Sequence, residues 1–289
     1  MNDYVIVTDS SCDLPADLAD ELGLVVLPLS VTVDGKTFKN YLDGREIDFK
    51  EFYAKLRGGA NAVTAAVNME TFRELFETEL KKGKDIIYLG FSSGLSGTYQ
   101  AGKLAADELR EEYPERKIFT LDTLCASMGQ GLCVWHVAKF AQQGKSFEEV
   151  CVFAQKIAPR CIHWFTVNDL FFLKRGGRVS AATAMLGTVL NIKPVLHVDD
   201  EGHLINMAKA RGRKASLNAV FEKLRDTGDD IHNQTIFISH GDCIEDAKYV
   251  EGLFRNYGVK DVIISYVGPV IGAHSGPGTL AVFCLGDVR

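Results

Sequence analysis

The chain has 289 residues, of which 46% are hydrophobic and 24% are charged, and its formal net charge is -6 at pH 7. A chain of this length exceeds what one compact core usually organises, so the length predicts two domains. The acidic balance, with no block of basic residues to offset it, argues against nucleic acid as the main partner.

The N-terminal segment MNDYVIVTDS carries acidic residues and leads directly into a strand-like run. It has neither the basic region nor the apolar core of a secretory signal peptide. No apolar run in the chain reaches the roughly 18 residues of a membrane span. The seven cysteines are odd in number and none forms a C-x-x-C pair, so we expect reduced, buried thiols. These features predict a cytoplasmic protein.

Strand and helix signals alternate through the first half of the chain, as they do in a mostly parallel sheet covered by helices. β-branched and aliphatic runs predict strands, and amphipathic periodicity with Pro or Gly at the ends predicts helices. The predicted strands cover residues 4–8, 24–33, 85–91 and 117–122, with a hairpin at Asp34-Gly35. The predicted helices cover 14–23, 48–58, 69–83, 99–113, about 126–143 and 146–158.

The second half of the chain predicts an α+β sandwich with a mixed sheet. The predicted strands cover residues 161–167, 193–198, 203–208, 234–240, 261–267 and 279–286. Helices are predicted at 212–228 and 244–258, and the segment 168–191 predicts a helix, a glycine break and a second helix. We therefore predict an N-terminal α/β domain over residues 1–160 and a C-terminal α+β domain over residues 161–289.

A serine- and glycine-rich loop, GFSSGLSGTYQ, occupies residues 90–100. It joins a predicted strand to a predicted helix and so lies at the carboxyl end of the strand, where open α/β sheets bind ligands. The first N–H groups and the dipole of the helix favour an anion, and Ser96 and Thr98 add hydroxyl donors. The alternative is that Ser96 or Thr98 only caps the helix.

Two further segments hold candidate ligand-binding residues. In GPVIGAHSGPGTLAVF, residues 268–283, glycines and prolines bracket His274 in a loop between hydrophobic strands. This setting favours a histidine that donates to an anion or carries a proton near neutral pH over one that only fills space. In LKRGGRVS, residues 173–180, basic side chains including Arg175 and Arg178 surround two glycines. Arginine suits bidentate contact with a carboxylate or phosphate, and a helix end with solvated basic residues is the alternative.

The serine loop also fits the G-x-S-x-G pattern of a serine-hydrolase nucleophile elbow. A hydrolase would use Ser92 with His240 or His274. An elbow needs its helix to begin directly after the nucleophile, and several loop-like residues intervene here, which weakens this hypothesis. The sequence contains no phosphate-binding loop, zinc-protease motif or complete dinucleotide fingerprint, and no Cys/His cluster with metal spacing. No nucleotide cofactor and no metal are therefore predicted.

Four segments, in this order, resemble the DegV family of bacterial fatty-acid-binding proteins. They are VTDSSCDLP, SSGLSGTYQ, FLKRGGRVS and IGAHSGPGTLA, and the short LDTLCASMGQG also fits. The resemblance spans the whole chain. It implies an N-terminal α/β domain joined to a C-terminal α+β domain, with a long-chain fatty acid held between them. Family members present the bound fatty acid to a separate kinase that phosphorylates its carboxylate, which implies a carrier in phospholipid metabolism without catalytic machinery of its own.

The resemblance also implies which residues meet the ligand. Those implied at the fatty acid carboxylate are Thr64, Ser96, Gly97 and His274. Those implied at the kinase-facing surface and head-group region are Arg175 and Arg178. The chain reads Thr64-Ala65-Ala66-Val67 where the family commonly has T-S-Q-P, so part of the head-group contact is expected to differ.

The leading hypothesis is thus a cytoplasmic carrier of a long-chain fatty acid that docks a fatty acid kinase and admits transient contact with a membrane surface. The serine hydrolase is one alternative. A regulatory module that binds another small acid is a second, and it predicts a polar pocket too short for an acyl chain. Several apolar residues near the basic motif either line an acyl tunnel or belong to an ordinary core: Phe165, Phe171, Phe172, Met185, Leu186 and Leu190.

Overall fold

The computed structural model describes residues 3–179 and 191–287. A four-stranded parallel sheet of the order β2-β1-β6-β7 organises the first half of the chain. Its strands are β1 (Tyr4–Asp9), β2 (Val25–Leu27), β6 (Asp85–Gly90) and β7 (Ile118–Asp122). Its helices are α1 (Ala16–Glu21), α3 (Met69–Lys81), α4 (Thr98–Glu112), α5 (Met128–Ala141) and α6 (Phe147–Ile157).

Side chains that alternate along β6 bury both faces of this sheet. Ile86 and Tyr88 pack in one core cluster with residues of α3 and α4, whereas Ile87 and Leu89 pack in another with residues of α5 and α6. A strand buried on both faces reads as a continuous apolar run, which is why the sequence predicts it clearly. The α/β fold class is confirmed for this half of the chain.

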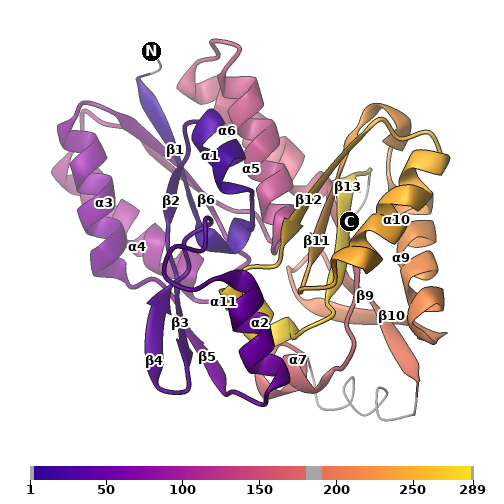
Figure 1. The fold of residues 1–289 in the computed structure, drawn as a ribbon. Coiled ribbons are helices and arrows are strands. Elements are labelled where there is room, and N and C mark those ends of the chain that lie inside the picture. The colour runs from indigo at the N-terminus through magenta and orange to yellow at the C-terminus, as the bar shows by residue number, and fades with distance from the viewer. Residues whose placement is uncertain (1–2, 180–190, 288–289) are drawn as a thin grey trace.

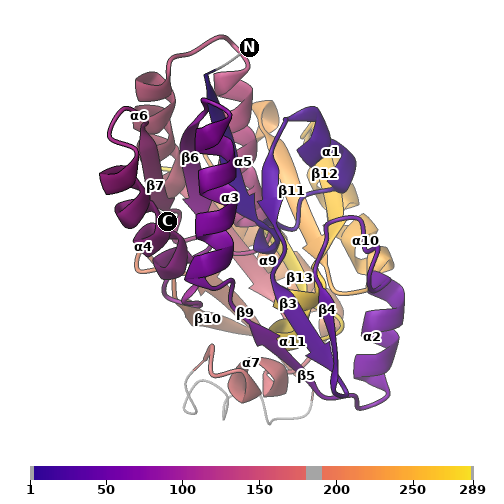
Figure 2. The ribbon, with the colours of Figure 1, turned by 90° about the vertical axis from the view of Figure 1, so that its left-hand side faces the viewer.

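A second, antiparallel sheet of the order β4-β3-β5 lies beside the parallel one. Its strands are β3 (Ser30–Val33), β4 (Lys36–Lys39) and β5 (Ala62–Ala65), and α2 (Phe49–Arg57) stands next to it in Figure 2. The single strand predicted at residues 24–33 is wrong, because β2 and β3 belong to different sheets. Pro28 separates them, and its missing N–H cannot donate to a sheet ladder.

A six-stranded mixed sheet of the order β10-β9-β8-β13-β11-β12 fills the second half, as predicted. Only β11 and β12 run parallel. The strands are β8 (Cys161–Thr166), β9 (Ile192–Val198), β10 (Leu204–Arg211), β11 (Thr235–His240), β12 (Asp261–Tyr266) and β13 (Leu280–Leu285). Helices α9 (Arg213–Thr227) and α10 (Ile244–Asn256) cover its outer face in Figure 1.

The inner face of the six-stranded sheet meets the first half of the chain. α5 contacts β8, β11 and β13, so this helix packs between the two large sheets. One hydrophobic cluster accordingly combines Leu132 and Val137 of α5 with Phe165 and Phe283 of the six-stranded sheet. All strands of the four-stranded and three-stranded sheets precede residue 123, and all strands of the six-stranded sheet follow residue 160. The boundary at residue 160 stays a prediction.

The segment between the last two strands is a short helix, α11 (Pro269–Ser275), and not the loop that its glycines and prolines predict. Pro269 occupies the first turn, where its missing N–H costs nothing. Val270 and Ala273 join the core cluster of the first half, against Phe52 and Tyr53. A helix from the end of the chain thus packs into the N-terminal half, between α2 and α7 (Phe171–Arg175) in Figure 1.

Two further expectations concern the cysteines and membrane-spanning helices. All seven cysteines are free, and six of them are buried, which agrees with the predicted thiols. In the part of the chain that the structure describes, no helix is long and apolar enough to cross a membrane. The second helix predicted within 168–191 lies largely outside the described residues.

Candidate functional site

A cavity of about 180 Å³ lies between the N-terminal elements and the inner face of the six-stranded sheet. Its apolar lining comes from both halves of the chain: Leu29, Ala65, Ala66, Phe91, Leu95, Ala126, Phe165, Leu173, Val198, Leu204, Val267, Val270, Ile271, Ala281 and Phe283. Its polar lining consists mainly of hydroxyl groups: Ser11, Thr64, Ser96, Ser127, Ser239, Ser275 and Thr279, with His163, His274 and Arg178. A mostly apolar concave site with a few convergent polar groups is typical of small-molecule binding.

The inner wall of the cavity is built by alternation along the central strands. Phe165 pairs with Ala281 across β8 and β13, and Ala281 pairs with Ser239 across β13 and β11. These three residues line the cavity, whereas their neighbours Trp164 and Val282 point into the cluster under α9 and α10. A one-residue shift of register would exchange the two sets.

The cavity opens at the edge formed by β5 and the serine loop. Ala65, Ala66 and Gly97 line it and are exposed, while Phe165 and Ser239 at the sheet are buried. The cavity therefore has a surface end, where polar candidate residues gather, and a buried end against the sheet. A strand at β5 was not predicted, although it positions Thr64.

Thr64 and His274 meet at the surface end. The Thr64 Oγ1 and His274 Nε2 atoms are 2.7 Å apart, and both side chains are half-buried. Thr64 sits on β5 opposite Val31 of β3, and His274 sits in the last turn of α11. Residues distant in sequence are joined here because α11 packs into the N-terminal core.

The serine loop presents its hydroxyl groups just before α4. Gly97 is the residue that precedes the helix, and the Thr98 N–H donates to Ser96 Oγ over 3.2 Å. The Ser96 and Thr98 hydroxyl oxygens are 3.0 Å apart. Ser96 thus satisfies one orphan donor of the helix, as the capping hypothesis expects, and its hydroxyl also lines the cavity at the positive end of the helix dipole.

The two arginines of the basic motif take different places. Arg178 lines the cavity, is half-buried, and donates from Nε to the Leu95 carbonyl over 3.2 Å. Burial lowers the pKa of its guanidinium. Among the described residues, Arg178 is the one charged side chain in the lining. Arg175 does not line the cavity; it is exposed and lies 5.0 Å from the Phe172 ring centre.

His274 is neutral near pH 7. Burial, together with the nearby charges of Arg178 and Arg175, lowers the pKa of its imidazole to about 4. A neutral imidazole donates one hydrogen bond and accepts one. The ring therefore acts as a fixed hydrogen-bonding group here, and the expectation that it exchanges a proton near neutral pH is not met.

Gly176 packs closely against the imidazole of His274. A Cβ atom at residue 176 would lie 2.3 Å from His274 Nδ1. We expect Gly176→Ala to displace the imidazole and to cost about 1–3 kcal/mol in the free energy of unfolding, measured by urea denaturation. Gly252→Ala is the matched control, because a Cβ there meets nothing within 4 Å and should leave stability equal or higher. An equally stable Gly176→Ala protein would contradict the packing.

The serine-hydrolase hypothesis finds no support in the geometry. Ser92 is buried outside the cavity lining, and its hydroxyl donates to the Gly202 carbonyl over 2.9 Å. His240 Nδ1 accepts from the Cys243 N–H, while His274 contacts Thr64. The histidines proposed as its base thus contact other groups, and α4 begins only at Thr98, six residues after Ser92.

A buried hydrogen-bond network around the carboxyl of Asp13 adjoins the cavity, and no role was predicted for this residue. Asp13 follows the short helix at Ser10–Cys12 and accepts from the Ser127 hydroxyl over 2.5 Å and from the Gly268 N–H over 3.0 Å. Ser127 is in turn 3.0 Å from the Ser239 hydroxyl. The N-terminal signature VTDSSCDLP contains Asp13, but only the fold shows which distant groups it joins.

Asp13 makes the stability of the protein depend on pH. Burial raises the pKa of its carboxyl to about 8, and the charge of Asp9 contributes to the rise. Between pH about 4 and about 8 the folded protein holds this proton and the unfolded chain does not, so stability falls as pH rises through that window. We expect the free energy of unfolding of Asp13→Asn, minus that of the wild type, to grow from pH about 4 to about 8 and then level off. Urea denaturation across that range measures it, and a constant difference would contradict it.

The apolar candidates near the basic motif do not all line the cavity. Phe165 lines the cavity, whereas Phe171 and Phe172 do not. Met185, Leu186 and Leu190 lie outside the described residues. Within residues 3–179 and 191–287, no group of three or more His, Cys, Asp or Glu side chains could hold a metal ion.

The fold and cavity define an α/β protein in which two sheet-based halves enclose a mostly apolar cavity. The model of the DegV family, described as "Uncharacterised protein, DegV family", matches residues 3–287. A DegV domain-containing protein of Clostridium perfringens is 44% identical over 290 residues, covering 100% of this chain and 99% of the relative. The chain belongs to the DegV family.

Solved structures agree with this membership. A DegV family protein from Thermus thermophilus, described by its fatty acid binding, has a TM-score of 0.88 at 30% identity, covering 99% of this chain and 100% of that chain. DegV from Bacillus subtilis, described as a fatty acid binding protein, has a TM-score of 0.84 at 27% identity, covering 99% and 100%. The predicted family and fold are confirmed.

Proposed function

We propose that this protein binds a long-chain fatty acid and presents its carboxylate to a fatty acid kinase in the cytoplasm. The observation that carries the proposal is the convergence of Thr64, Ser96, Gly97, Arg178 and His274 on one mostly apolar cavity. The fatty acid binding described for the relatives from T. thermophilus and B. subtilis supports the same ligand class.

The carboxylate occupies the surface end of the cavity in this proposal. A carboxylate taken out of water needs several donors, or it binds a proton instead. The hydroxyls of Thr64 and Ser96, the imidazole of His274 and the backbone at Gly97 supply them, and the α4 dipole adds positive potential. The guanidinium of Arg178, half-buried in the same lining, favours the charged form of the ligand.

The acyl chain occupies the buried end, against Phe165, Ala281 and Phe283. Each buried methylene contributes about 0.8 kcal/mol, so about 14 methylenes contribute roughly 11 kcal/mol before the costs of binding. This term supplies the affinity, and the polar groups orient the head. The hydroxyl groups and His163 in the lining place some polar surface beside the acyl chain.

The protein itself makes and breaks no bond in this scheme. A carboxylate oxygen of the bound fatty acid attacks the γ-phosphorus of ATP held by the kinase, which yields an acyl phosphate and ADP. The exposed lining at Ala65, Ala66 and Gly97 leaves the head accessible for this attack. The alanines at residues 65 and 66 provide no side-chain donors, so the head group relies on Thr64, Ser96 and His274.

The surface that docks the kinase lies beside this opening. Lys174 and Arg175 are exposed at the end of α7, and Phe171 on the same helix is 55% exposed. Exposed basic groups next to an exposed aromatic ring suit an acidic protein surface. The same combination supports transient contact with an anionic membrane surface during loading.

Reconstitution with a fatty acid kinase, ATP and radiolabelled oleate tests the proposal. Acyl phosphate is trapped with hydroxylamine and counted. We expect product only when the carrier is present, and we expect Arg175→Glu to lower its formation at least about tenfold while oleate binding changes less than about twofold. Lys209→Glu, at an exposed position of β10, is the matched control. Product formation without the carrier, or equal loss in both variants, would contradict the kinase role.

A further inference from the structure

The helix that carries His274 is fixed to the rest of the molecule at both of its ends. α11 begins after Gly268, whose N–H donates to Asp13 Oδ1 over 3.0 Å. His274 lies in the last turn of the same helix. Any shift of α11 along its axis would therefore change the 2.7 Å contact between His274 and Thr64.

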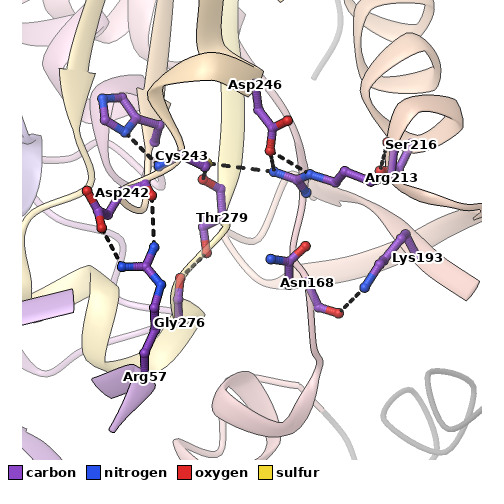
Figure 3. A network of polar contacts seen from close by, with 11 residues as sticks. Arg57, Asn168, Lys193, Arg213, Ser216, Asp242, Cys243, Asp246, Gly276 and Thr279 are labelled. Atoms are coloured by element: carbon purple, nitrogen blue, oxygen red, sulfur yellow. Dashed lines mark hydrogen bonds and ion pairs between the residues drawn. The ribbon is translucent and has the colours of Figure 1, made fainter. Parts of the chain in front are cut away.

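The C-terminal end of α11 is held through a neighbouring turn. Figure 3 shows the Thr279 hydroxyl, which donates to the Gly276 carbonyl over 2.8 Å, and Arg57 against Asp242. The Gly241 N–H donates to the Thr279 carbonyl over 2.8 Å, and the Gly278 N–H donates to the Gly241 carbonyl over 2.7 Å. Arg57 of α2 forms an ion pair with Asp242 in that turn and also donates to its carbonyl. The Arg57 side chain is 46% exposed, so this ion pair is screened by solvent and contributes little.

The N-terminal end is held by a buried group. Asp13 is 3% exposed, and its two carboxyl oxygens take the Ser127 hydroxyl and the Gly268 N–H. A Cβ atom at Gly268 would lie 2.7 Å from Asp13 Oδ1, which shows how closely the chain approaches the carboxyl. Hydrogen bonds out of contact with water fix geometry more firmly than exposed ion pairs do.

Asp13 also connects this helix to the wall of the cavity. Ser127 and Ser239, which continue the network from its carboxyl, both line the cavity, as does Val267 directly before Gly268. We propose that Asp13 is a positioning residue that sets the place of α11, and through it the head-group contact of His274. This proposal rests on the fatty acid binding proposed above.

A double-mutant cycle tests whether Asp13 acts through His274. Asp13 has a backbone φ of +52°, so Asp13→Gly removes the carboxyl without adding strain. We expect Asp13→Gly to weaken oleate binding about tenfold in the wild-type background and less than about twofold in a His274→Ala background. Asp13→Asn keeps a side chain of the same size and an oxygen that accepts the Gly268 N–H. This variant should bind oleate within about twofold of the wild type. Equal losses in both backgrounds would overturn the proposal.

Asp9→Asn is the matched control. Asp9 is a buried acid of the same segment, but it accepts from the Ser11 and Phe91 N–H groups and from Gln130, and not from α11. Its effect should add to that of His274→Ala. Gly268→Ala approaches the same contact from the helix side and replaces Asp13→Gly if that variant does not fold. It should also be non-additive with His274→Ala.

An NMR measurement separates this proposal from the proposed function. The imidazole ¹⁵N signal of His274 in ligand-free protein is assigned by its disappearance in His274→Ala. We expect Gly268→Ala and Asp13→Gly to shift it and Asp9→Asn to leave it in place, whatever the protein binds. A wild-type protein that binds no fatty acid would overturn the function, whereas an unshifted His274 signal in both variants would overturn the positioning role.

Discussion

Replacing His274 with alanine is expected to weaken binding of a long-chain fatty acid by about 10- to 100-fold. The loss follows from a hydrogen bond to a charged group, which contributes about 1.5–3 kcal/mol when its partner is desolvated. The variant also frees the Thr64 hydroxyl, which is 2.7 Å from the imidazole in the intact protein. Fluorescence titration or calorimetry with oleate measures the effect.

The matched control for this prediction is His232→Ala. His232 stacks on Tyr257 outside the cavity lining, so its loss should leave the affinity within about twofold. Because the pKa of His274 lies at about 4, its protonation should not alter the wild-type affinity between pH about 6 and 8. Unchanged affinity in His274→Ala would show that the carboxylate lies elsewhere.

Replacing Ala281 with phenylalanine is expected to block the buried end of the cavity. Ala281 lines the cavity between Phe165 and Ser239, so a larger side chain there takes the space assigned to the acyl chain. Excluding about four methylenes costs about 3 kcal/mol, which lowers the affinity for hexadecanoate by about 100-fold or more. Dodecanoate, with a shorter chain, should lose much less.

The control for Ala281→Phe lies on the other face of the same sheet. Ala210 of β10 packs against the cluster under α9 and α10, away from the cavity. Ala210→Leu should keep the wild-type ratio of hexadecanoate to dodecanoate affinity. If Ala281→Phe folds and binds both acids as the wild type does, the acyl chain does not reach the sheet.

The sequence predicted elements well where local signals and packing agree. The strand at β6 is apolar throughout because both of its faces are buried, and the helices that follow carry clear apolar periodicity. Pro28 indicates a break within the predicted strand at 24–33, because a proline has no N–H to donate to a neighbouring strand. The prediction did not use this signal. Local patterns singled out Ser96, His274 and the two arginines as ligand candidates. The family resemblance added Thr64 and Gly97.

Two elements of the site could not be predicted from local sequence. β5 is rich in alanine, which has weak strand propensity, and it forms because it pairs with β3. α11 contains glycines, which disfavour helices. Gly272 is needed there because a Cβ would lie 2.5 Å from the Tyr53 hydroxyl, and Val270 and Ala273 gain burial in the N-terminal core. Tertiary packing decided both elements.

The role of Asp13 depends on contacts between residues far apart in the chain. Its partners Ser127 and Gly268 come from different halves of the sequence, and neither stands in a pattern that indicates the contact. A short acidic motif after a strand is consistent with a turn, a cap or a ligand site. Only the burial of the carboxyl and the position of α11 separate these alternatives.

Native mass spectrometry of the purified protein, followed by denaturing extraction and lipid identification, tests fatty acid binding most directly. We predict a near-stoichiometric added mass that matches a long-chain fatty acid, is released on denaturation, and is reduced in Ala281→Phe. A protein that carries no lipid and also fails to take up added palmitate or oleate would contradict the carrier function.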